Sequence, residues 1–203
     1  MPISINGSGT ITGISVGGLP DGIVDTDMLA ANAVSSAKLA SGAGGITEAD
    51  SWRLSASTSF GTGTNTVASN WERDDTNFEK IGTGLSHDGS GKFGFQVTGK
   101  YLLTFFYTGA ILSGNDAFYT GIRVYLATDG ISGTYSEMAQ NLDSVKGMSS
   151  SSTYAAGAIS KILDVTNTNT YFYLAAYVTG SVTWRLEGDT HQTGFTVVKL
   201  GGT

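Results

Sequence analysis

The chain has 203 residues, a formal net charge of −6 and no cysteine. The lack of cysteine excludes a disulfide framework and a Cys-ligated zinc site, and the acidic excess argues against a partner that presents nucleic-acid phosphates. Charged residues make up only 14% of the chain, against roughly 25% in an average globular protein, so we expect an uncharged surface rich in hydroxyl groups and loops.

The first 45 residues cannot form a hydrophobic core of their own, because all 21 aromatic residues lie at or after Trp52. Met1-Pro2-Ile3 begins no basic segment and no apolar run follows it, so we expect no signal peptide and synthesis in the cytoplasm. No part of the chain approaches the ~18 consecutive apolar residues of a membrane span, so we expect no membrane insertion.

Extended segments begin this region, and a weak repeat follows in which residues 24–30 are echoed by residues 34–40. Each copy begins with side chains that can cap a helix and ends in Leu-Ala. Such runs are too short to be stable alone, since isolated helices below ~12 residues are marginal. We therefore predict an extended arm, residues 1–45, with short helical turns that dock on a partner; a disordered linker is the alternative. The residues expected to dock are Ile3, Ile5, Ile11, Val24, Leu29, Val34 and Leu39.

From residue 46 onward, apolar side chains recur in steps of two, which is typical of β-strands. Turn-forming pairs such as Asp88-Gly89 and Asp129-Gly130 separate these runs, as in an all-β sandwich. Within residues 118–126, we expect Phe118 to share one face with Thr120 and Ile122. We find no helical stripe of useful length in residues 46–203. The expected strands are 52–56, 93–97, 118–126, 182–186 and 195–199.

Two segments are apolar on both faces of the predicted strands. In residues 101–107 one face can enter the core, while the other still needs cover. Residues 154–163 show the same pattern with smaller side chains. A subunit interface would supply the cover, and a second layer within the same chain is the alternative. The expected interface residues are Leu102, Phe106, Tyr154 and Ala156.

Several motifs in residues 50–200 resemble the heads of the complement and tumour-necrosis-factor (TNF) superfamily. They are Phe78-Glu79-Lys80-Ile81, Gly91-Lys92-Phe93, Gly99-Lys100-Tyr101 with the aromatic strand after it, and the terminal run Gly194-Phe195-Thr196-Val197. The resemblance implies a ten-stranded jelly roll of two sheets, whose inner sheets form a threefold interface. The chain departs from the secreted animal members because it has no cysteine and because we expect no signal peptide.

The arm carries a second resemblance, in Ile3-Ser4-Ile5-Asn6-Gly7, Gly18-Leu19-Pro20-Asp21-Gly22 and the Leu-Ala repeats. These stretches are similar to the N-termini of tail-fibre and related virion proteins of marine tailed bacteriophages. Ser51-Trp52-Arg53-Leu54 and Asn70-Trp71-Glu72-Arg73 are similar to the openings of jelly-roll heads on such proteins. The resemblance implies a homotrimeric virion protein, docked on other virion proteins by residues 1–45, whose head binds a host-surface glycan or protein. A capsid or tail decoration protein is the alternative.

Short loops on a rigid sandwich are suitable for contact with a receptor, since they can vary without unfolding the domain. If strands alternate in direction, the loops near 115–116, 149–152 and 189–192 should lie together at the end away from the arm. The expected receptor contacts are Asn115, Asp116, Ser150, Asp189 and His191.

The sequence offers little catalytic chemistry, and we expect no enzyme, metal site or cofactor. Gly89-Ser90-Gly91-Lys92 departs from a phosphate-binding loop, because Ser86 replaces the first glycine and Phe93 replaces the magnesium-binding hydroxyl, so we expect a turn before a strand. A glycan-hydrolysing tailspike, with two carboxylates about 5 to 9 Å apart, is the remaining alternative. Its candidate carboxylates, which we expect to lie in solvated loops, are Glu72, Asp74, Asp75, Glu79, Glu187 and Asp189.

Overall fold

The computed structural model describes residues 4–5, 11–12, 45–76, 78–112, 116–147 and 151–203. The chain divides into two compact units, residues 1–45 and 46–203. In the first, β1 (Ser4–Ile5) pairs antiparallel with β2 (Ile11–Thr12), so Ile5 and Ile11 are in strands and opposite each other. The predicted helical turns and the docking residues Ile3, Val24, Leu29, Val34 and Leu39 lie outside the described residues. Among the described residues, no helix is long and apolar enough to cross a membrane.

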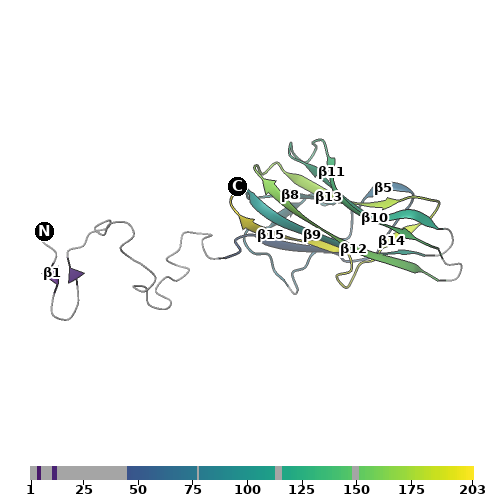
Figure 1. Ribbon diagram of the computed structural model, residues 1–203, viewed down its shortest axis with the longest axis horizontal. Helices are drawn as coiled ribbons and strands as arrows, with labels where there is room; N and C mark the ends of the chain where they lie inside the picture. The colour runs from purple at the N-terminus through teal and green to yellow at the C-terminus, as the bar shows by residue number, and fades with distance from the viewer. Residues whose placement is uncertain (1–3, 6–10, 13–44, 77, 113–115, 148–150) are drawn as a thin grey trace. The chain divides into compact units, whose positions relative to one another are not determined.

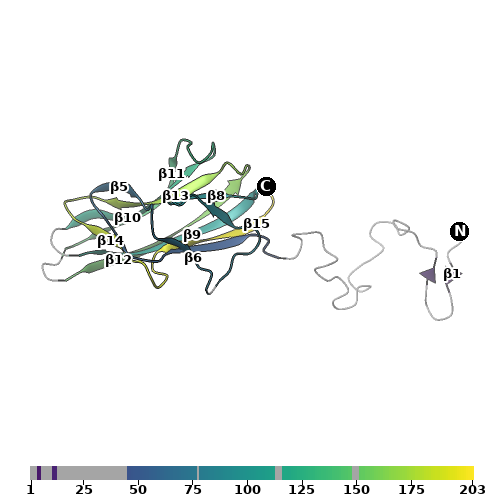
Figure 2. The same cartoon turned by 180° about the vertical axis from the view of Figure 1, so that it is seen from behind.

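Residues 46–203 form two antiparallel sheets packed face to face (Figures 1 and 2). The six-stranded sheet has the order β11-β10-β13-β8-β7, with β5 also paired to β13. The seven-stranded sheet has the order β4-β14-β9-β15-β3-β6, with β12 paired to the other side of β9. The strands of the first are β5 (Gly63–Thr66), β7 (Leu85–His87), β8 (Lys92–Phe95), β10 (Ala117–Ala127), β11 (Ser136–Val145) and β13 (Tyr171–Val178). Those of the second are β3 (Ala49–Leu54), β4 (Thr58–Phe60), β6 (Trp71–Arg73), β9 (Gly99–Ile111), β12 (Thr153–Val165), β14 (Trp184–Leu186) and β15 (Gly194–Gly201).

The aromatic side chains fill the space between the sheets. Phe93 lies near the middle of this cluster, with its ring centroid 4.7 Å from Phe195 and 5.6 Å from Phe172. On β9, Leu103 and Phe105 are fully buried, whereas Leu102, Thr104 and Phe106, which alternate with them, are half-buried. This alternation confirms the prediction that one face of residues 101–107 enters the core, and the two sheets confirm the all-β jelly-roll sandwich.

One predicted face is wrong at the start of β10. Phe118 is 70% exposed, although Thr120 and Ile122 on the same expected face are fully buried. The cause is a register shift between Ala117 and Thr120, where β10 pairs with β11. Such a bulge inserts one residue and reverses the alternation of the side chains before it.

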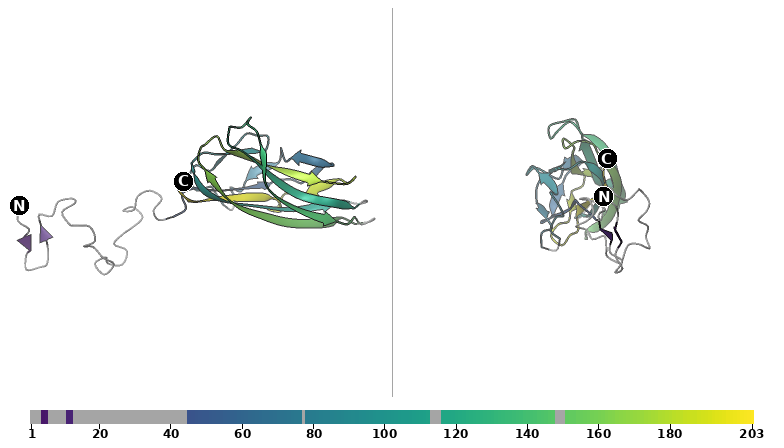
Figure 3. Two further views of the ribbon diagram at one scale, coloured as in Figure 1. Left: turned by 45° about the horizontal axis from the view of Figure 1, so that its top comes forward. Right: turned by 90° about the vertical axis from the view of Figure 1, so that its left-hand side faces the viewer.

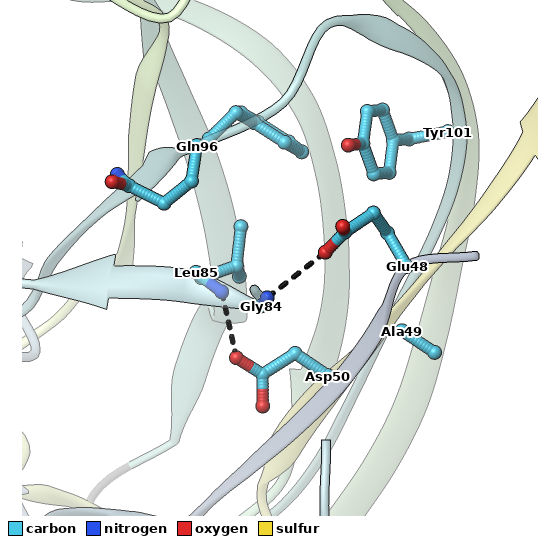
Figure 4. A pocket seen from close by; sticks show the side chains of 8 residues that line it. Glu48, Ala49, Asp50, Gly84, Leu85, Gln96 and Tyr101 are labelled. Carbon is cyan, nitrogen blue, oxygen red and sulfur yellow. Dashed lines mark hydrogen bonds between the residues drawn. The ribbon is translucent and has the colours of Figure 1, made fainter. Parts of the chain in front are cut away.

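A buried carboxylate connects the two sheets. Asp50 on β3 accepts hydrogen bonds from Arg73 Nε and Nη2, at 2.9 and 3.0 Å, and from the backbone N–H of Leu85 at 2.8 Å. Since β3 and β6 belong to one sheet and β7 to the other, this group fixes their relative position. Figure 4 shows that Asp50 and Glu48 point toward the same backbone turn, where Glu48 accepts a hydrogen bond from the Gly84 N–H at 2.9 Å.

The stretch that resembled a phosphate-binding loop is a turn. Asp88 accepts hydrogen bonds from the Ser90 N–H at 2.7 Å and from the Lys92 N–H at 3.0 Å, and β8 begins at Lys92. These bonds, with one from the Ser90 hydroxyl, lower the pKa of Asp88 against the opposing effect of burial. The carboxylate therefore occupies the loop interior, as the sequence predicted for a turn before a strand.

Candidate functional site

The outward face of the seven-stranded sheet carries an aliphatic row that crosses four strands. Ile162 on β12 pairs with Leu102 on β9, Leu102 pairs with Val198 on β15, Val198 pairs with Ala49 on β3, and Ala49 bridges to Ile81. Ile162 is 63% exposed and Ile81 38%. We call these five residues the aliphatic row. Leu102 was predicted to need cover, and it is half-buried on this face.

A row of hydroxyl groups runs parallel to the aliphatic row. Thr104 and Ser160 lie side by side across β9 and β12, with their oxygens 3.3 Å apart. Ser51 and Thr196 form the corresponding pair across β3 and β15, also at 3.3 Å. Each hydroxyl therefore already has a partner in its own chain. This part of the face can be covered without leaving these polar groups unsatisfied.

Phe106 was also predicted to need a second subunit, but its own chain covers part of it. The imidazole of His191 stacks on the Phe106 ring at 5.2 Å with an angle of 21° between the planes. His191 is held in turn by Asp74, at 3.4 Å. Phe106 is half-buried as a result. The apolar surface that remains uncovered on this face is therefore centred on the aliphatic row and not on Phe106.

Tyr154 and Ala156, the other predicted interface residues, are exposed on the outward side of β12. Tyr154 is 58% exposed and pairs with Ala110, which pairs on its other side with Arg185. Arg185 donates to Glu187 at 2.6 Å, and this hydrogen bond raises the pKa of Arg185. Tyr154 and Ala156 therefore lie on the same face as Leu102, as the alternation predicted.

The predicted receptor residues do not form one cluster. Asp116 accepts a hydrogen bond from the Gly147 N–H at 2.8 Å, which connects the β9–β10 loop with the β11–β12 loop. Asp189 lies elsewhere, beside β3, where its carbonyl accepts a hydrogen bond from Arg53, and His191 lies over Phe106 on β9. Asn115 and Ser150 lie outside the described residues. The prediction from alternating strand directions failed for this loop, because residues 188–193 fold back over the sheet.

A polar pocket of about 370 Å³ opens beside this loop. It is lined by Arg53, Thr76, Asp189, Thr190 and His191. Arg53 is also paired with Glu72 at 2.9 Å. Within the described residues, no three histidine or acidic side chains are grouped closely enough to hold a metal ion.

Two of the candidate carboxylates contradict the expectation of a solvated loop. Asp74 and Glu187 are both buried, at 7% and 8% exposure. Asp74 contacts His191, and Glu187 is held by Arg185 and by the Ser57 hydroxyl at 2.8 Å. Partners of opposite charge and hydrogen-bond donors make the burial of these carboxylates tolerable. Asp75 and Glu79 are exposed, as expected.

Four members of the aliphatic row were not among the predicted interface residues: Ala49, Ile162, Val198 and Ile81. The period-two pattern alone does identify Val198, because it alternates with the core residues Phe195 and Val197. The alignment of Ile162 with Leu102 depends on strand register. Ile81 is outside any strand, and nothing in the local sequence indicates its bridge to Ala49.

The two sheets and their strand order define a TNF-like jelly roll. The structure is similar to Eiger TNF from S. frugiperda, with a TM-score of 0.52 at 12% identity over 78% of this chain and 96% of that one. It is also similar to murine APRIL, with a TM-score of 0.52 at 16% identity over 75% of this chain and 98% of that one. No protein-family model and no curated sequence matches the chain. These likenesses establish the fold of the head.

Proposed function

We propose that the chain is a non-enzymatic, homotrimeric component of a tailed-bacteriophage particle. Residues 1–45 dock it on other virion proteins, and the jelly-roll head binds a component of the host surface. The observation that supports this proposal best is the outward face of the seven-stranded sheet, which carries an unpartnered aliphatic row.

The aliphatic row is suited to self-association rather than to solvent. Ile162 is exposed, and Leu102 and Val198, which follow it in register, are half-buried, so these three side chains form one continuous strip; Ala49 is already covered by its own chain, at 4% exposure. Complete burial of an aliphatic side chain contributes about 1.5 to 3 kcal/mol. The hydroxyl row beside it is internally paired, so covering it costs little in lost hydrogen bonds.

A trimer is the assembly that fits this face best. The strip crosses the sheet from the edge strand β12 to β3, so the edge of one subunit can pack on the face of the next. Such a contact is heterologous, and it forms a closed ring when the rotation between neighbouring subunits is that of a cyclic symmetry. The resemblance of the head to the complement and TNF superfamily implies closure at three subunits.

The virion assignment is supported by the sequence of the arm, which resembles phage tail-fibre N-termini. In this account the chain is made in the host cytoplasm and incorporated into the particle. The head projects from the particle, with Asp116 held by the Gly147 N–H between the connections that follow β9 and β11. A decoration protein would share the arm and the trimer, but would not bind host cells in isolation.

The mass of the intact chain in solution tests the proposed assembly. Light scattering at micromolar concentration should report three chains, and the double variant Leu102→Ser/Ile162→Ser should report one. Phe118→Ser is the matched control, because it removes an exposed apolar side chain from the other sheet. A wild-type monomer, or a double variant that remains trimeric, would refute the proposed interface. Binding of purified protein to host cells then separates an attachment protein from a decoration protein.

A further inference from the structure

The outward face of the six-stranded sheet differs in chemistry from the face just described. On β13, Phe172, Leu174, Ala176 and Val178 are fully buried and share the core face, whereas Tyr171, Tyr173 and Tyr177 alternate with them and are half-buried. The outward residues of β13 and its partner β10 are mainly aromatic, and the two strands run side by side along the head (Figure 3). We call this set the aromatic ladder: Phe118, Tyr119, Tyr125, Tyr171, Tyr173 and Tyr177.

The middle of the ladder is held rigid by ring contacts. Tyr125 and Tyr173 are directly opposite in the β10–β13 register and stack at 5.0 Å with an angle of 11° between the rings. Tyr135, from the loop before β11, lies 5.0 Å from Tyr173 and is tilted by 56°. Burial, together with nearby Asp88, raises the pKa of Tyr135 to about 12, and its hydroxyl donates to the Ile131 carbonyl at 3.1 Å. These rings form a preorganised surface with hydrogen-bonding edges.

The bulge in β10 extends the ladder toward the far end of the head. Because of the register shift between Ala117 and Thr120, Phe118 and Tyr119 both avoid the core, and they are 70% and 57% exposed. The backbone there is fixed, since the Tyr119 N–H donates to Thr179 Oγ1 at 2.7 Å and the Thr179 N–H donates to the Tyr119 carbonyl at 2.9 Å. The rings of Phe118 and Tyr119 are thus attached to a backbone that is already ordered, so binding a ligand there costs little conformational entropy of the protein.

The charge of this face points to an uncharged ligand. Arg123 lies 3.5 Å from the Tyr177 ring and 3.4 Å from Glu137, so its charge is already compensated. Lys92 donates to the Ile131 carbonyl at 2.9 Å and lies 5.1 Å from the Tyr135 ring. Arg123 and Lys92, which lie beside the aromatic ladder, therefore both have partners within the chain. Neither is free to bind a carboxylate or phosphate group of a ligand.

We infer that the aromatic ladder binds a linear, uncharged oligosaccharide that lies along β10 and β13. The inference deepens the proposed function, on which it rests for the presence of a host-surface ligand. Sugar rings stack on aromatic faces through their C–H groups, and tyrosine hydroxyls donate and accept hydrogen bonds to sugar hydroxyls. From Tyr171 to Tyr177 the ladder spans about 20 Å at ~3.3 Å per residue, which suits several sugar units.

The same argument disfavours a second copy of the chain as the occupant. Self-association would leave the tyrosine hydroxyls in need of new partners, and the aliphatic row already provides an apolar surface on the opposite face. Small hydroxyl residues lie next to the tyrosine rings, since Thr64 and Thr66 on β5 pair with β13. Tyrosines surrounded by such residues are typical of surfaces that bind polar ligands.

The test uses the full chain and an immobilised array of neutral hexose and deoxyhexose oligosaccharides, with acidic oligosaccharides as comparison. At least one neutral oligosaccharide should bind, and saturation-transfer NMR on that compound should show transfer from tyrosine rings. Tyr119→Ala and Tyr173→Ala should each weaken binding about tenfold, equivalent to about 1.4 kcal/mol. Tyr173→Phe, which keeps the ring, should weaken it less.

The control variant Leu200→Ser removes an exposed apolar side chain from β15 in the other sheet and should leave the affinity unchanged. Binding to no neutral oligosaccharide, preference for acidic ones, or equal binding by the Tyr→Ala variants would each overturn the inference. The mass of every sample is measured in parallel by light scattering. A trimer without sugar binding contradicts the ladder alone, whereas a monomer that binds sugar contradicts the proposed assembly alone.

Discussion

Asp50 and Arg73 form a two-point ion pair in which Arg73 Nε and Nη2 donate to opposite oxygens of the carboxylate, at 2.9 and 3.0 Å. The carboxylate of Asp50 is only 2% exposed, and the Arg73 guanidinium also donates to the Leu85 carbonyl at 2.9 Å. Removing Asp50 takes away the only carboxylate bound by the Arg73 guanidinium in this group and leaves the backbone N–H groups of Leu85 and Ser51 without their acceptor. We expect Asp50→Ala to lower the free energy of unfolding by about 3 to 5 kcal/mol.

The matched control is Glu72→Ala, which breaks the exposed pair with Arg53 on the outward side of the same sheet. An exposed pair contributes about 1 kcal/mol or less. Urea unfolding of both variants checks the difference. Equal, small losses in the two variants would show that Asp50 does not hold the sheets together.

Gly109 lies directly against Trp184, and this contact leaves no room for a side chain. A Cβ at Gly109 would overlap the indole ring, which is fully buried. We expect Gly109→Ala to destabilise the head by about 1 to 3 kcal/mol through overpacking. Gly61→Ala is the control, since a Cβ there meets nothing within 4 Å. Thermal unfolding of both variants checks the prediction, and an unchanged Gly109→Ala melting temperature would contradict it.

His87 should make the head less stable in mild acid. Its ring stacks on Phe93 at 4.7 Å, and its pKa is lowered from 6.5 by burial, with Asp88 opposing the shift and Arg73 adding to it. Because the folded pKa lies below the unfolded value, the unfolded chain takes up the proton first. The contribution of neutral His87 is therefore complete above about pH 6.5 and is lost as the pH falls through the folded pKa.

Urea unfolding at about pH 7 and about pH 5 measures this effect. His87→Gln, which does not titrate and retains an acceptor for the Gly91 N–H, should show a smaller loss of stability between the two values. If the wild type and the variant lose the same stability, another group is responsible.

The arm should contribute little to the stability of the head. All buried hydrophobic residues that the structure describes lie between Ala49 and Val197. Deletion of residues 1–45 should therefore shift the melting temperature by only a few degrees and leave a β-rich trimer, while abolishing incorporation into particles. A truncated head that still assembles on virions would contradict the docking role, and one that cannot trimerise would make the arm part of the subunit interface.

The fold class could be predicted because period-two alternation is a local property, and residues 101–107 of β9 follow it without a break. Phe118 was misplaced because a bulge depends on how β10 pairs with β11, which no local pattern specifies. The role of Asp50 was not foreseen for a related reason. Its partners Arg73 and Leu85 are 23 and 35 residues away in the sequence.

The candidate interface was predictable only in part. Leu102, Tyr154 and Ala156 lie on the predicted face, because alternation determines the side of a strand. Cover for Phe106 by His191 was not predicted, since it requires the loop after β14 to fold back over β9. The strand β11 was not predicted from the sequence. Most of its residues are polar and at least partly exposed, so its sequence shows no clear alternation of apolar and polar side chains.

Cysteine labelling provides the most direct measurement of whether the outward face of the seven-stranded sheet is covered in solution. The natural chain has no cysteine, so Ile162→Cys introduces a single thiol on the aliphatic row, and Phe118→Cys introduces one on the opposite sheet at similar exposure. With both variants at the wild-type mass, the thiol at position 162 should react with a maleimide far more slowly than the thiol at position 118. Equal, fast labelling at both positions would contradict the subunit interface.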